Sequence, residues 1–106
     1  LTTIGESAFR NLDQIEKLVI PGTVTTIGIC AFYDCDGLQE IAIPDSVTSI
    51  GKAAFAYCRN VTDIQLPDQL ETIEEQAFMG CSKVSSLRIP DSVKTIKDEA
   101  FRYIYI

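Results

Sequence analysis

A fixed repeat of 23 residues constrains the fold of this chain more than any other feature of its sequence. Ala-Phe pairs recur with that spacing, and so do single prolines that follow short apolar segments. The pairs begin at Ala8, Ala31, Ala54, Ala77 and Ala100, and the prolines are Pro21, Pro44, Pro67 and Pro90. A constant period between about 20 and 50 residues is typical of a solenoid, in which neighbouring units bury each other's apolar residues. We therefore predict one array over residues 1–106, about four and a half units long and part of a longer protein.

The spacing inside one unit predicts its local structure. Ile41 and Ile43 alternate with a period of two, which favours a short half-buried strand, and Pro44 ends the ladder because it has no N–H to donate. The β-branched segment 47–50 favours a second short extended arm. Alanines in residues 52–57 favour one or two turns of helix. We expect an α/β repeat fold: a right-handed solenoid with short parallel strands on its concave face, and short arms and helices on the other side.

The core is predicted from seven apolar positions that recur in the units. In the second unit these positions hold Val24, Ile27, Phe32, Cys35, Leu38, Ile41 and Ile43. Because equivalent residues of stacked units lie above one another, we expect Phe32, Phe55 and Phe78 to form one continuous column. The glycine that follows the isoleucine of the arm is replaced by Glu74 and Lys97 in the later units, which suggests that glycine is not required there.

Three of the four cysteines share one position of the repeat. They are Cys35, Cys58 and Cys81. Leucine or isoleucine fills the same position in the first and last units, so we expect buried, reduced thiols there rather than disulfides. Cys30 occupies a different position, which we predict to be at the surface, and it is the more reactive thiol on this interpretation. The chain has no histidine and no CxxC pair, so we expect no metal site of that kind.

Charge and composition exclude several classes of function. The chain carries 9 basic and 15 acidic residues, a balance that argues against nucleic acid or an anionic membrane as the main partner. No apolar run reaches the roughly 18 residues that a membrane span needs, so we expect no membrane insertion within this chain. Without histidine, no Ser/His/Asp or Cys/His pairing can form, and no phosphate-binding glycine loop is present. We predict a protein that is not an enzyme and needs no cofactor.

The unit reads L-x-x-I-x-I-P-x-x-V-x-x-I-G-x-x-A-F-x-x-C, and this pattern covers the whole chain. It resembles the leucine-rich repeats of the BspA type, also called the Treponema pallidum class. The resemblance implies a leucine-rich-repeat solenoid from a bacterial cell-surface or secreted protein. It also implies adhesion to host proteins, extracellular matrix or other cells, and it supplies no catalytic residue.

A candidate binding surface follows from the residues that point outward from the predicted strands. They are Lys17, Val19, Glu40, Ala42, Asp63, Gln65, Ser86 and Arg88. These positions vary from unit to unit while the core repeats, so we predict a protein partner on this face. The alternative is a solvated face on a structural spacer that displays another domain and has no ligand of its own.

Two other sets of residues are candidate sites. The first is an acidic column after the prolines, Asp45, Asp68 and Asp91, for which calcium is the alternative to ordinary turn residues. The second is the group of tyrosines near the predicted helices, Tyr33, Tyr57, Tyr103 and Tyr105. For the tyrosines we predict packing at the edge of the core, and the alternative is a second partner contact on the convex side.

Overall fold

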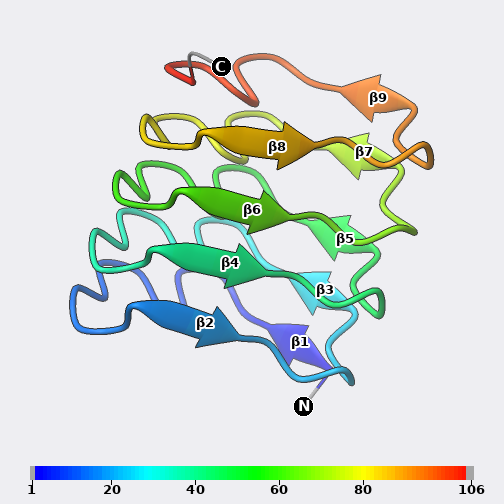
Figure 1. Ribbon diagram of the computed structural model, residues 1–106. Helices are drawn as coiled ribbons and strands as arrows, with labels where there is room; N and C mark the ends of the chain where they lie inside the picture. The colour runs from blue at the N-terminus through cyan, green and yellow to red at the C-terminus, as the bar shows by residue number, and fades with distance from the viewer. Residues whose placement is uncertain (1, 105–106) are drawn as a thin grey trace.

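The chain rises as a stack of similar units from its blue end to its red end (Figure 1). The computed structural model describes residues 2–104. Each complete unit contributes a strand of three residues to one side of the stack and a strand of two residues to another side. The architecture is therefore a β-solenoid of about four turns with a period of about 23 residues. This confirms the predicted stacking of parallel units.

The longer strands form one continuous parallel sheet. They are β2 (Lys17–Val19), β4 (Glu40–Ala42), β6 (Asp63–Gln65) and β8 (Ser86–Arg88). The strands pair in the order β2-β4-β6-β8 with a register of one unit, so that Ile41 lies opposite Leu18 on one side and Ile64 on the other. Ile41 and Ile64 are buried, as the alternating pattern predicted.

The shorter strands correspond to the predicted extended arms. They are β1 (Thr3–Ile4), β3 (Thr26–Ile27), β5 (Ser49–Ile50), β7 (Thr72–Ile73) and β9 (Thr95–Ile96). They form two separate parallel sheets, β1-β3-β5 and β7-β9, which lie along the right side of the stack in Figure 1.

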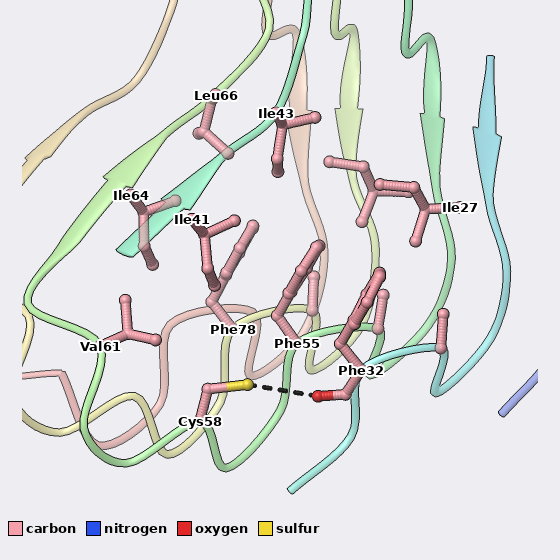
Figure 2. Packing of buried hydrophobic residues seen from close by; sticks show 14 of the residues in the cluster. Ile27, Phe32, Ile41, Ile43, Phe55, Cys58, Val61, Ile64, Leu66 and Phe78 are labelled. Carbon is pink, nitrogen blue, oxygen red and sulfur yellow. Dashed lines mark hydrogen bonds between the residues drawn. The ribbon is translucent and has the colours of Figure 1, made fainter. Parts of the chain in front are cut away.

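A column of phenylalanine rings runs through the core. Phe32 and Phe55 have ring centroids 5.1 Å apart, and Phe55 and Phe78 have centroids 5.5 Å apart, with the planes within 7° of parallel in both pairs. Figure 2 shows these three rings one behind the other, facing the isoleucines of the longer strands. All three side chains are almost fully buried. The expectation that equivalent residues of successive units form a column is confirmed.

The predicted helices are wrong, and the fold is not α/β. Residues 52–57 form consecutive turns, and alternate N–H groups donate to carbonyls of the next unit, from Ala53 at 3.0 Å, Phe55 at 2.9 Å and Tyr57 at 2.6 Å. Ala53 and Tyr57 adopt the left-handed region, with φ values of 56° and 61°. A helix about 10 Å wide cannot repeat at the 5.1–5.8 Å spacing of the rings beside it. Bonds between units therefore replace the bonds of a helix.

Residues 2–104 accordingly include no helix that is long and apolar enough to span a bilayer.

The ladder of short strands is interrupted between β5 and β7, where glycine gives way to glutamate in the repeat. A Cβ added at Gly51 would lie 2.7 Å from the backbone nitrogen of Ile29, so this arrangement has no room for a side chain. The later units carry Glu74 and Lys97 instead, and these two side chains form an ion pair at 2.9 Å. Lys97 donates its backbone N–H to the Ile73 carbonyl at 2.9 Å, just as Gly51 donates to Ile27 at 2.8 Å, so a side chain at this position does not by itself prevent pairing. Within residues 2–104, the ladder is broken at the step where Glu74 follows a glycine, and β7 pairs with β9 but not with β5.

Candidate functional site

The eight residues predicted to point outward all lie on the sheet of longer strands. We call this surface the strand face. The register aligns Lys17, Glu40, Asp63 and Ser86 in one column and Val19, Ala42, Gln65 and Arg88 in a second. All eight are exposed. The structure therefore brings together every residue of the predicted surface, in the predicted two columns.

The core fixes the position of this surface. In each strand the middle residue points inward and the two flanking residues point outward, because side chains alternate along an extended chain. Ile41 and Ile64 are 1% and 3% exposed, so they hold their strands against the phenylalanine column. The outward side chains make none of these core contacts. A change at an outward position should therefore alter the surface without disturbing the fold.

Ion pairs on the strand face are few and exposed. Lys17 Nζ lies 3.9 Å from a carboxylate oxygen of Glu40, and Arg88 Nη1 lies 3.7 Å from Asp68 Oδ1. Exposed pairs of this kind contribute only about 0–1 kcal/mol each to stability. Asp63 forms no ion pair with another residue of the range 2–104, although it sits between Glu40 and Ser86 in the register. The strand face thus carries charged side chains that contribute little to the stability of the fold.

Two adjoining hollows lie on the strand face. The first has a volume of about 450 Å³, and its polar lining comes from Asp45, Asp63, Gln65, Asp68, Ser86 and Arg88. The second has a volume of about 380 Å³ and is lined mainly by apolar residues, among them Leu18, Val19, Ile20, Ala42 and Pro44. They share Ile43, Asp45 and Gln65. The strand face is therefore hollowed in two places, and one hollow is acidic while the other is mainly apolar.

The acidic column after the prolines has a structural role and also borders the strand face. The backbone N–H of Asp68 donates to Asp45 Oδ1 at 3.0 Å, which links one turn to the next. Within residues 2–104, no group of three or more potential ligands gathers for a metal ion. Asp45 and Asp68 nevertheless line the larger hollow, a position that sequence reasoning missed. Their place shortly after the outward strand residues is the signal that could have revealed it.

The three cysteines at one repeat position serve the core. They are free thiols that are 0–1% exposed, and each donates to the carbonyl of a phenylalanine 26 residues earlier at 3.2 Å. Figure 2 shows this bond from Cys58 to Phe32. The neighbouring thiol of Cys58 and burial raise the pKa of Cys35 above its ordinary value. The structure thus agrees with buried free thiols, while Cys30 is half-buried.

The tyrosines line the turn side of the stack. The rings of Tyr33 and Tyr57 meet edge to face at 5.6 Å, and the Arg59 guanidinium lies 5.2 Å from the Tyr57 ring centroid. Tyr57 and Tyr103 border a hollow of about 310 Å³ across Gly80. Tyr33 and Tyr57 are half-buried against a small cluster that includes Met79, which agrees with packing at the core edge. Tyr105 lies outside the described residues.

A comparison with protein-family profiles identifies this architecture. The profile described as a BspA type leucine rich repeat region, with six copies, matches residues 2–106. The chain belongs to the BspA type leucine-rich repeat family. Comparison with curated proteins gives no significant match.

Solved structures of similar bacterial proteins share the fold. A leucine-rich repeat protein from Bacteroides ovatus is 36% identical with a TM-score of 0.91, over 96% of this chain and 26% of its own length. A leucine rich cell surface protein from Faecalibacterium prausnitzii is 36% identical with a TM-score of 0.80, over 84% of this chain and 24% of its own. The T. pallidum leucine rich repeat protein is 28% identical with a TM-score of 0.85, over 91% of this chain and 45% of its own. The chain thus spans a quarter to a half of these relatives.

Proposed function

We propose that the chain is a protein-binding module of a bacterial cell-surface or secreted protein. It acts in adhesion by holding host proteins, extracellular matrix or other cells on the strand face. Its family and its similarity to a cell surface protein of F. prausnitzii support this location.

One observation carries the proposal. The eight outward side chains are exposed on a sheet whose middle residues are buried in β4 and β6 and half-buried in β2 and β8, so the surface is formed before a partner binds. A preformed surface loses little conformational entropy on binding, which favours affinity. The two hollows of the strand face can receive side chains of a partner. The carboxylate of Asp63, which has no ion pair within the described residues, can pair with a cation of that partner.

A triple variant of the parent protein tests this function. Glu40→Ala, Asp63→Ala and Arg88→Ala remove two acidic and one basic side chain from the strand face. The matched control removes the same charges elsewhere, through Lys52→Ala, Glu75→Ala and Asp98→Ala. We expect the strand-face variant to lose capture of immobilised host surface and matrix proteins while its thermal unfolding stays unchanged. Capture that survives in the strand-face variant would refute the proposal.

A stiff spacer is the second candidate function. The stacked rings from Phe9 to Phe101, with centroids 5.1–5.8 Å apart, give the array the continuous contacts that a rigid stalk needs. A spacer displays another domain and holds no ligand itself. In the same capture experiment it predicts that neither triple variant changes binding, because the binding domain lies elsewhere in the parent protein.

A further inference from the structure

We propose that the strand face receives an extended peptide segment of its partner that presents one apolar side chain and one basic side chain. The apolar side chain enters the hollow beside Val19, and the lysine or arginine enters the hollow beside Asp63. This inference rests on the proposed function and adds the chemistry of the partner to it.

The charge of the larger hollow selects a cation. Its lining includes three carboxylates, from Asp45, Asp63 and Asp68, against one cation, Arg88. Arg88 is already paired with Asp68 at 3.7 Å. Asp45 accepts one backbone N–H, and neither Asp45 nor Asp63 forms an ion pair within the described range. An incoming ammonium or guanidinium therefore meets two uncompensated carboxylates, which come from two different turns of the stack.

The neighbouring hollow selects an apolar group. Val19 is 77% exposed, the largest exposed fraction among the large apolar side chains of the described residues. Ala42 lies beside it in the register, and Pro44 borders the same hollow. The one cation there, Lys17, is paired with Glu40. Covering Val19 with an apolar side chain would remove apolar area from water, which favours binding.

The distance between the two hollows fits one extended segment. The hollows share Asp45 and Gln65, so a ligand can pass from one to the other without leaving the surface. Asp63 lies two strand steps across and two residues along from Val19 in the register, which is about 12 Å at roughly 4.8 Å per step and 3.3 Å per residue. An extended chain covers that distance in about four residues, and residues four apart point to the same face. The two anchors of the partner should therefore lie four residues apart.

An NMR titration of the isotope-labelled protein tests the proposal with defined probes. The first probe is a nonapeptide of serine and glycine that carries one leucine and, four residues later, one lysine. The second probe replaces the lysine by glutamate, and the third replaces the leucine by serine. We expect the first probe to shift the amide signals of β2, β4, β6 and β8, and the other two to bind several-fold more weakly.

Two charge-matched variants locate the effect. Asp45→Asn with Asp63→Asn should weaken binding of the lysine peptide by roughly tenfold, as expected for two exposed ion pairs. Glu6→Gln with Asp98→Asn changes the net charge equally but lies away from the strand face, so it should leave binding unchanged. Val19→Ser should abolish the advantage of the leucine peptide over the serine peptide.

Several results would overturn the proposal. They are equal binding of the lysine and glutamate peptides, equal losses in the two double variants, no binding of the lysine peptide, or shifts confined to another face. The proposed function fails separately, because it requires only that the strand-face triple variant loses capture. If capture is lost in that variant but persists in Asp45→Asn with Asp63→Asn, the strand face binds its partner without a basic anchor.

Discussion

Removing one ring from the middle of the phenylalanine column should cost far more stability than removing the ring at its first position. Phe55 is fully buried and stacks on a ring at each face, 5.1 Å from Phe32 and 5.5 Å from Phe78. Replacing a buried phenylalanine by alanine costs about 3–5 kcal/mol, and stacked pairs add to the loss. Because Phe55 loses two such pairs, we expect Phe55→Ala to lower the free energy of unfolding by about 4–5 kcal/mol.

Phe9→Ala is the matched comparison. Phe9 is 42% exposed and stacks on one ring only, Phe32 at 5.4 Å, so we expect a loss of about 1–2 kcal/mol. Urea unfolding followed by circular dichroism measures both. With an m-value of about 1.5 kcal/mol per molar urea, the midpoint should fall by roughly 3 M for Phe55→Ala and by roughly 1 M for Phe9→Ala. Similar losses for the two variants would refute the reasoning that stability comes from the stacked column.

Three further predictions use other features of the stack. The pKa of Cys35 and of Cys58 is raised in the fold, so above pH 9, the ordinary thiol value, both stay protonated there while the unfolded thiols ionise. The free energy of unfolding measured in urea should therefore fall with rising pH by about 2.7 kcal/mol per unit, about 1.4 for each thiol, and a flat profile contradicts this. Glu74→Gly should restore pairing between β5 and β7, seen as new amide-exchange protection at Glu71, and unchanged exchange contradicts it. In Gly80→Ala, the added Cβ would lie 2.5 Å from the Tyr57 ring on a backbone with φ at 80°, so the free energy of unfolding measured by thermal unfolding should fall by about 2 kcal/mol. Gly22→Ala is the control, because the space around Gly22 is open and this variant should be nearly neutral.

The period of the sequence predicted most of the fold because the same physical demand recurs in every unit. An apolar residue must face the residue one unit away, so the columns of Phe55 and Ile41 follow from spacing alone. The same alternation placed the outward residues, which is why all eight candidate positions appear on the strand face. The prediction of buried, free cysteines succeeded for a similar reason, because leucine and isoleucine fill the same position elsewhere.

The turns could not be predicted because their bonds run between units. Alanine favours helix in an isolated segment, but the N–H groups of Ala53 and Phe55 bond to the next unit instead. Each unit has two left-handed positions, and the first of them is filled by Ser7, Cys30, Ala53, Gln76 and Glu99, none of which is glycine. No residue type in the sequence therefore indicated this first position. The hollows also escaped prediction, since their walls combine strand residues with Asp45 and Asp68 from the following turns.

Equivalent residues of successive units lie directly over one another, and contacts between their aromatic rings are the most direct measurement of this stacking. In an NMR experiment on protein with selectively labelled phenylalanine, we expect strong ring-to-ring nuclear Overhauser effects from Phe55 to both Phe32 and Phe78. We expect no direct effect between Phe32 and Phe78, which Phe55 separates. Missing contacts from Phe55 to either neighbour, or a direct contact between Phe32 and Phe78, would contradict the stacked arrangement and the strand face built on it.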